Sequence, residues 1–362
     1  MDEQRSRGGA LPAVSRARPV TGAVTLKQVA AEAEVSLATA SRVLHRSGGR
    51  EVRGELAERV QAAAGRLGYV SNPHAQALAR ARSSTVGLIV HDVTDPYFAA
   101  IAAGAMHAAH AEGVMVMMAA TFRDPELELE YLSRLRAQGA RGVLLAGSAS
   151  TQARVSERLA ESIAAFAREG GRVAAIGARP EANVDAVVPE NAAGATAALE
   201  HLREQGHQHI AVVAGPETLL TVRERLGGLG RGLRVIESDF TREGGRRAAL
   251  ELFTSAPETT AVIALNDLMA AGVLAAAAEA GRQVPRDLSV IGFDDLPFAA
   301  DLNPALTTVR LPLRQMGESA MKLLLANPAE TEQDPAAPVA PSVVPMPTEL
   351  VVRGSTAAPT SS

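Results

Sequence analysis

The sequence predicts an α/β protein in which a small all-α module precedes a two-lobed core of doubly wound parallel sheets. Three observations predict this architecture. Positive charge is concentrated in the first 84 residues, short helical patterns follow one another from residue 25, and strand-like and helix-like segments alternate after residue 84. Such alternation is typical of parallel sheets built from βαβ units.

Composition places the chain among globular proteins with an aliphatic core. It has 362 residues, of which 47% are hydrophobic and 21% charged, enough for a small module and a larger core. The absence of cysteine excludes disulfides, thiolate metal sites and cysteine nucleophiles. We find no apolar leader segment and no window able to span a bilayer. We therefore expect a cytoplasmic protein with no membrane partner.

The charge is divided unevenly along the chain. Residues 1–84 contain 13 Lys and Arg against 7 Asp and Glu, whereas the remainder contains 23 against 33. A basic module suits the neutralisation of nucleic-acid phosphates, while the acidic remainder would be repelled by them. A solvated arginine-rich tail explains the same charges, so charge alone leaves both interpretations open.

Three short helices are expected in the N-terminal module. Thr25 and Gln28 form a capping-box pattern, which predicts a helix to about Ala33. Ser36 is a second N-cap candidate before a helix over residues 37–45, and a third helix is expected over 54–67. Two short helices joined by a few residues, with a third closing the core, are typical of a helix-turn-helix.

The core is expected to contain two series of alternating elements. The first series of strands is expected at 85–90, 114–119, 142–146 and 172–176, with helices at 97–112, 125–138 and 151–168. The second series of strands is expected at 209–214, 233–237, 261–264 and 288–293, with helices at 193–205, 242–254 and 267–280. Each series is sufficient for one doubly wound lobe.

These elements predict the domain organisation of the whole chain. We expect a flexible leader (1–22), a helix-turn-helix module (23–70), a hinge helix or linker (71–84), a two-lobed core (85–326), a proline-rich linker (327–345), a final core strand (346–355) and a tail (356–362).

The segments VTLKQVAAEAEVSLATASRVLH (24–45) and LGYVSNPHAQALA (67–79) resemble the N-terminal module of the LacI/GalR repressor family. The resemblance continues through most of the chain and implies a periplasmic-binding-protein-like core. It implies a transcriptional repressor that binds palindromic double-stranded operator DNA as a homodimer and responds to a small-molecule effector, with no cofactor.

The same resemblance implies roles for individual residues at the DNA end. It implies base contacts from Leu37, Ala38 and Arg42, phosphate or backbone contacts from Thr25, Ser36 and Ser41, and minor-groove contacts from Asn72, Ala75 and Leu78, of which Leu78 is the wedge. Leu37 and Ala38 would equally suit a helix surface packed on a core, and Arg42 could be a solvated charge.

Some positions of the module depart from the family pattern. Glu34 stands at a turn position where the family usually has glycine. The third helix also lacks the usual polar residues at Arg53 and Leu56, which puts phosphate contacts there in doubt.

The effector pocket is expected between the lobes, at the carboxyl ends of the strands. The matching residues of this chain are Tyr97, Phe98, Thr221, Arg225, Phe240, Asn266, Asp267 and Asp294. Individually the aromatic pair could pack a helix start, and Asn266, Asp267 or Asp294 could cap a helix or turn. Together they suit sugar hydroxyls or a purine.

The effector class stays open because two segments depart from the family. Gly177, Ala178 and Arg179 stand where many sugar-responsive members have an acidic residue, and the segment after Arg225 is short. The shortening predicts that part of one crossover helix is lost. A ligand-independent regulator, in which the core serves only as a dimeriser, is therefore a second interpretation.

Two further classes of protein fit the sequence less well. A sugar-binding transport protein needs an export signal and has no use for a basic helix-turn-helix. An enzyme is not indicated, because we find no P-loop, HExxH or GxSxG motif and no clustered metal ligands. His207 and His209 form an HxH pair that could bind metal, but this spacing is more often a surface feature, so no metal site is predicted.

Overall fold

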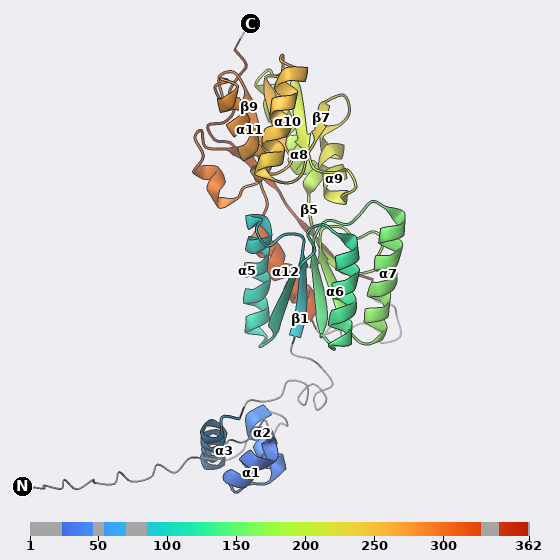
Figure 1. Cartoon of the computed structure of the whole chain (residues 1–362), viewed down its shortest axis with the longest axis vertical. Helices are drawn as coiled ribbons and strands as arrows, with labels where there is room; N and C mark the ends of the chain where they lie inside the picture. Colours follow the sequence, from blue (N-terminus) through green and yellow to red (C-terminus); the bar gives the residue numbers. More distant parts are fainter. Residues whose placement is uncertain (1–23, 46–53, 70–84, 327–339, 361–362) are drawn as a thin grey trace, which may run out of the picture. The chain divides into compact units, whose positions relative to one another are not determined.

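The computed structural model describes residues 24–45, 54–69, 85–326 and 340–360 (Figure 1). The chain divides into two compact units, Met1–Ala81 and Arg82–Ser362. No helix in the described ranges is both long and apolar enough to cross a membrane.

The first unit contains three helices around a small apolar core. They are α1 (Leu26–Glu32), α2 (Leu37–His45) and α3 (Gly54–Leu67). The α1 capping box forms as expected, since Gln28 N donates to Thr25 Oγ1 and Thr25 N donates to Gln28 Oε1 at 2.7 Å. Val29, Ala40 and Val60 are fully buried between the helices. The predicted three-helix arrangement is therefore confirmed.

The turn between α1 and α2 contains a strained residue. Glu34 has φ +53°, a left-handed conformation that costs a non-glycine residue roughly 1–2 kcal/mol. Arg59 of α3 stabilises this turn, because its Nη2 donates to Ala33 O at 2.7 Å and lies 3.2 Å from Glu34 Oε2. The backbone therefore takes the shape that glycine would give it.

Lobe 1 of the second unit is a parallel sheet with helices on both faces (Figure 1). Its strands, in spatial order, are β11 (Val343–Met346), β5 (Asp185–Pro189), β4 (Arg172–Ile176), β3 (Gly142–Ala146), β1 (Thr85–Val90) and β2 (Met115–Ala120). One face is covered by α5 (Pro96–Ala111) and α12 (Leu313–Leu325), and the other by α6 (Pro125–Ala137) and α7 (Ala153–Arg168).

Lobe 2 repeats this plan with one antiparallel edge. Its strands, in spatial order, are β12 (Glu349–Val351), β10 (Thr307–Arg310), β9 (Ser289–Asp294), β8 (Ala261–Ala264), β6 (Ile210–Ala214) and β7 (Arg234–Glu237). Only β12 is antiparallel to its neighbour. The helices are α8 (Asn191–Glu204), α9 (Leu220–Leu229), α10 (Arg242–Ser255) and α11 (Asp267–Glu279), with a 3-10 turn η1 (Pro297–Ala300). The predicted pair of doubly wound lobes is confirmed.

The chain crosses between the lobes three times. It leaves lobe 1 after β5, returns after β10 to form α12, and leaves again between β11 and β12. The helix α12 packs closely on α5, because a Cβ on Gly104 would lie 1.9 Å from Arg314 O and one on Gly317 would lie 2.0 Å from Ile101 O. These two glycines let the helix backbones touch.

The C-terminal expectations need correction. Residues 343–345, expected within the proline-rich linker, belong to β11, because their backbone pairs in parallel with β5. The final strand, expected over 346–355, is limited to β12 at Glu349–Val351. Beyond it the chain is held by side chains: Ser355 Oγ donates to Val290 O at 2.6 Å and accepts from Thr307 N at 2.8 Å.

Candidate functional site

Helix α2 presents the residues expected to read bases on its exposed side. Leu37 is 52% exposed, and Ala38 and Arg42 are also exposed, whereas Ala40 is fully buried. Among the described residues Arg42 makes no ion pair or hydrogen bond, so its guanidinium is available to a ligand. Ser36 caps the helix by accepting from Thr39 N at 3.1 Å.

The expected phosphate-contacting residues lie around this helix. Thr25 and Ser36 are exposed and Ser41 is half-buried. The hydroxyl groups of Thr25 and Ser36 already serve as helix caps, so a phosphate would have to share them. Asn72, Ala75 and Leu78, expected in the minor groove, lie outside the described residues.

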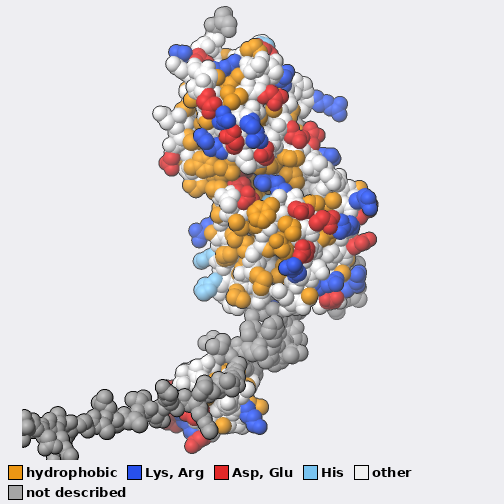
Figure 2. Space-filling model, in the orientation of Figure 1, with side chains coloured by type: hydrophobic (Ala, Val, Ile, Leu, Met, Phe, Trp, Pro, Cys, Tyr) orange, Lys and Arg blue, Asp and Glu red, His pale blue; other side chains and the backbone are white. Residues whose placement is uncertain are grey.

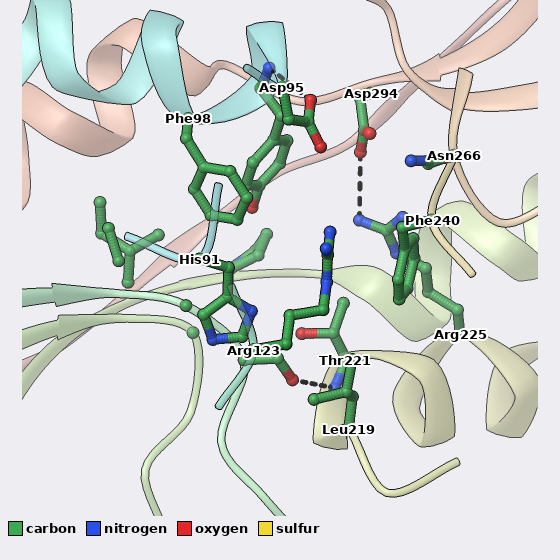
Figure 3. Close-up of a pocket in the computed structure, with 17 residues that line it drawn as sticks. His91, Asp95, Phe98, Arg123, Leu219, Thr221, Arg225, Phe240, Asn266 and Asp294 are labelled. Carbon is green, nitrogen blue, oxygen red and sulfur yellow. Dashed lines mark hydrogen bonds and ion pairs between the residues drawn. The ribbon is translucent and has the colours of Figure 1, made fainter. Parts of the chain in front are cut away.

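A pocket opens between the lobes where strands of both sheets end (Figure 3). It encloses about 630 Å³, counting the part open to solvent. Of the eight predicted effector residues, seven line this pocket: Tyr97, Phe98, Thr221, Arg225, Phe240, Asn266 and Asp294. The geometry therefore brings nearly all of them together.

Arg225 is the most completely bonded residue of the pocket. Its Nε donates to Asn191 Oδ1 at 3.0 Å, its Nη1 donates to Leu265 O, and its Nη2 lies 3.2 Å from Asp294 Oδ1. The guanidinium also lies 3.7 Å from the centre of the Phe293 ring. Burial raises the pKa of Asp294 well above its usual range, an effect that the neighbouring Arg225 opposes.

The short segment after Arg225 still forms a crossover. The helix α9 runs over Leu220–Leu229 and ends at Gly230, which has φ +76°. The strand β7 then pairs in parallel with β6. Because Arg225 lies in the middle of this ten-residue helix, the shortening leaves it in the pocket.

Lobe 1 contributes a wall of aromatic rings and one carboxylate. Asp95 caps α5 by accepting from Tyr97 N at 2.9 Å, and burial raises the pKa of Asp95. The rings of Tyr97 and Phe98 meet edge to face at 4.9 Å between centroids. His91 lies next to Phe98, and burial together with Arg123 and Arg179 lowers the pKa of His91 to about 3. His91 is therefore neutral at physiological pH.

Sequence reasoning missed His91, Asp95 and Arg123. Arg123 follows β2, and it has φ +63° after Phe122 at φ +52°. Its guanidinium lies 5.3 Å from the centre of the Phe240 ring, which belongs to lobe 2 (Figure 3). The available signal was position: each missed residue lies just after a strand of lobe 1 or at the start of the next helix.

Two glycines provide the space that these side chains occupy. A Cβ on Gly147 would lie 2.3 Å from His91 Nε2, and one on Gly215 would lie 2.2 Å from Phe240 Cε2. Any larger residue would push the imidazole or the phenyl ring into the pocket.

Backbone hydrogen bonds join the lobes beside the pocket. The amides of Thr151 and Leu220 donate to the carbonyl groups of Thr218 at 2.8 Å and Ala149 at 2.9 Å. The loop after β3 is thereby fixed to the loop before α9 along one side of the cleft.

Asp267 does not line the pocket, so this assignment is corrected. Its side chain is fully buried, where Oδ1 accepts from Thr308 Oγ1 at 2.5 Å and Oδ2 accepts from Leu296 N at 2.7 Å. Asn266 caps α11 by accepting from Met269 N at 2.8 Å. The residue after the cap points into the lobe because the helix has begun to turn. Asp267 therefore anchors the segment that follows Asp294.

Gly177 and Arg179, where the sequence departs from the family pattern, lie in different surroundings. Gly177 lines the pocket with φ +94°, a conformation that an acidic residue would find strained. Arg179 lies away from it and pairs with Glu128 at 2.9 Å.

The two histidines of the HxH pair, His207 and His209, differ in burial. His207 is buried, with Nδ1 2.9 Å from Thr260 Oγ1 and Nε2 2.9 Å from Ala357 O, whereas His209 is exposed. Within the described ranges no three His, Asp or Glu side chains are grouped to hold a metal ion.

The anchoring role of Asp267 predicts a pH dependence. Burial raises the pKa of Asp267 to about 7, so between pH 4 and 7 the folded state retains a proton that the unfolded chain loses. Its contribution to stability is therefore full below pH 4 and is lost as pH rises through 7. Asp267→Asn mimics the protonated acid, so the free energy of unfolding of this variant should improve relative to wild type as pH rises.

Urea unfolding at pH 4.5 and pH 8 measures this difference, which amounts to roughly 1.4 kcal/mol per unit of pKa shift. Asp301→Asn, at an exposed acid of the same lobe, is the matched control. If the free energies of unfolding of Asp267→Asn and wild type differ by the same amount at both pH values, the raised pKa of Asp267 is contradicted.

Comparison with known proteins identifies the family. Residues 25–72 match the model of bacterial regulatory proteins of the lacI family, and residues 199–356 match a periplasmic binding protein-like domain. The HTH-type transcriptional repressor CytR of Escherichia coli (strain K12) is 32% identical, covering 95% of this chain and 99% of that protein. The ribose operon repressor of Bacillus subtilis (strain 168) is 32% identical, covering 83% and 90%.

Solved structures agree over nearly the whole chain. The lac repressor dimer bound to operator and the anti-inducer ONPF is 25% identical, with a TM-score of 0.79 over 93% of this chain and all of that chain. The complex of the transcriptional regulator CelR with cellobiose is 31% identical, with a TM-score of 0.65 over 92% and 99%. With both its N-terminal module and its core matched, this chain belongs to the lacI family of bacterial regulatory proteins.

Proposed function

We propose that the protein is a sequence-specific transcriptional repressor whose affinity for operator DNA is set by a small molecule bound between its lobes. The observation that carries the proposal is helix α2, which exposes Leu37, Ala38 and Arg42 in a module of the lacI family. Within the described ranges the Arg42 side chain makes no ion pair or hydrogen bond. Its relatives are transcriptional repressors, and we propose for this chain the same role, without catalysis and in the cytoplasm.

Each exposed residue of α2 has a role that its chemistry allows. The guanidinium of Arg42 suits guanine, whose O6 and N7 accept two parallel hydrogen bonds in the major groove. Leu37 and Ala38 suit apolar contact with a thymine methyl group. Thr25, Ser36 and Ser41 would fix the register through phosphates, and Asn72, Ala75 and Leu78 would contact the minor groove.

Arg42→Ala should remove the preference for one operator base pair. Loss of a bidentate contact costs about 1–3 kcal/mol, or roughly tenfold to a hundredfold in specific affinity. Mobility-shift titrations on the operator and on versions substituted at each position measure the preference. Arg66→Ala removes an equal charge from α3 and should leave base preference unchanged. An unaltered preference in Arg42→Ala would refute the assignment.

The pocket supports the effector half of the proposal. It combines two carboxylates, an amide, aromatic rings and a hydroxyl at the ends of strands, as sites for sugars and nucleosides do. The β1 strand joins this pocket to the boundary between the two units, since it begins at Thr85 and is followed by His91. A ligand that changes the closure of the lobes would act on that boundary through a coupling of about 1–3 kcal/mol.

Asp294→Asn should abolish or weaken effector binding, because the substitution keeps the side-chain shape but removes the charge facing the pocket. A metabolite panel scored by thermal shift on wild type should reveal a ligand that loses roughly tenfold or more in affinity in this variant. Thr221→Val is a second variant that leaves Arg225 paired. A ligand that binds both variants undiminished would count against this pocket, and a panel without any ligand would favour a ligand-independent regulator.

The protein should act as a homodimer, because each module reads one half of a palindrome. Exposed apolar side chains gather on edge strands and one helix: Met115, Met117 and Met118 of β2, Met106 of α5 and Val235 of β7. Figure 2 shows hydrophobic side chains gathered over lobe 1, whereas charged groups are dense over lobe 2. The related lac repressor structure is a dimer.

Met115→Glu should weaken self-association at least tenfold, because burying an unpaired carboxylate costs several kcal/mol. Sedimentation equilibrium measures the dissociation constant. Val343→Glu, at an equally exposed residue of β11 on the opposite edge of the same sheet, is the matched control. A dimer that tolerates Met115→Glu as well as Val343→Glu would place the interface elsewhere.

A further inference from the structure

A second, more polar pocket adjoins the effector pocket. It encloses about 460 Å³, counting open space, and shares His91, Arg123, Ser148 and Leu219 with the first. Its remaining lining comes mainly from the ends of α6 and α7 and the loops before them: Thr121, Asp124, Pro125, Glu128, Ser150, Gln152 and Thr218. A ligand in the first pocket can therefore extend past Arg123 into the second.

Arg123 has no counter-ion at this junction. Among the described residues its only close partner is the Phe240 ring. At longer range its positive charge acts to lower the pKa values of His91, Asp92 and Asp95. By contrast, Arg225 is fully paired. Two successive left-handed residues, Phe122 and Arg123, hold the guanidinium in place at a cost of roughly 1–2 kcal/mol each. Such strain persists where the surroundings enforce it, commonly at functional sites.

Two buried polar side chains beside Arg123 also lack partners. The His91 imidazole is 7% exposed and Thr121 is 2% exposed, and neither side chain has a hydrogen-bond partner in the part of the chain that the structure describes. Both side chains line the second pocket, and their polar atoms are not among the fully buried, unpartnered atoms of the described residues, so both are available to a ligand. Figure 3 shows His91 and Arg123 side by side at the lobe 1 side of the first pocket.

The backbone adds further donors. Gln152, the N-cap residue of α7, lines this pocket, and its side chain makes no capping hydrogen bond. The first amides of a helix carry partial positive charge that favours an anion.

The carboxylates that line the second pocket are already engaged. Glu128 is paired with Arg179 at 2.9 Å. Asp124 caps α6 by accepting from Glu126 N at 2.8 Å. Neither carboxylate forms an ion pair with Arg123, whose charge is felt only at longer range by Asp92 and Asp95.

We propose that the effector is an acidic sugar derivative, whose hydroxyl groups bind Asp95, Asn266 and Asp294 and whose oxyanion binds Arg123 in the second pocket. The oxyanion is a phosphoryl or carboxylate group, for which a guanidinium supplies two parallel hydrogen bonds. Thr121 and His91 donate to the same group. This proposal rests on the proposed effector function of the cleft and specifies its ligand class.

Matched pairs of probes test the proposal on the full chain. Isothermal titration calorimetry compares glucose with glucose 6-phosphate, ribose with ribose 5-phosphate, and glucose with gluconate, with cytidine and inorganic phosphate as further probes. We expect at least one acidic member to bind roughly tenfold or more tightly than its neutral partner. The sugar phosphates test a phosphoryl group as the oxyanion, and gluconate tests a carboxylate. The preference should shrink as ionic strength rises.

Arg123→Gln should remove this preference, and Arg123→Lys should retain part of it, because lysine keeps the charge without the planar fork. Arg134→Gln, at an exposed arginine of α6, is the control that should keep it in full. Circular dichroism verifies that each variant is folded.

The failures of the two proposals can be told apart. Neutral sugars or nucleosides that bind as tightly as their acidic partners, or a preference that survives Arg123→Gln, would overturn the oxyanion site and leave the effector function standing. If no compound of either kind binds, both are overturned. Inorganic phosphate that binds alone, unaffected by Arg123→Gln, would also refute the site.

Discussion

The enclosure of the Arg225 guanidinium is the interaction on which the rest of lobe 2 depends. A charge buried this deeply costs several kcal/mol unless its partners are in place, and those partners come from α8, from the end of β8 and from β9. Four elements must therefore converge before the charge is satisfied. Their convergence fixes the carboxyl ends of the strands and hence one wall of the cleft.

The two walls differ in how far their polar groups are satisfied. Lobe 2 presents Arg225 and Asp294 already joined, so a ligand there exchanges one hydrogen bond for another. On lobe 1, His91, Thr121 and Arg123 line the second pocket, and their side chains make no hydrogen bond to other described residues. A ligand that reached them would add hydrogen bonds there instead of replacing existing ones. That lobe also contains β1, the first described strand after the boundary between the two units.

Local patterns predicted much of this structure, and non-local contacts account for what they missed. The Thr25 cap and the buried apolar strands are encoded within a few residues, and the resemblance to the family located seven pocket residues. The sequence did not predict β5, β10, β11, α9 or α12. For β11, which pairs with β5, and α12, which packs on α5, the contacts join segments far apart in sequence. Asp267 was misplaced because one step along a helix turns a side chain by about 100°, which directs Asp267 into the lobe and not into the pocket. Arg123 belongs to no motif, and only its unusual backbone and lack of a counter-ion mark it.

The three crossings between the lobes have a consequence for biosynthesis. Lobe 1 needs α12 and β11, which are made after nearly all of lobe 2. On the ribosome, the first lobe must therefore wait with the apolar faces of α5 and β5 uncovered until about residue 346 has emerged. Exposed apolar surface in a nascent chain favours aggregation, and truncation before that point would remove elements from both lobes together.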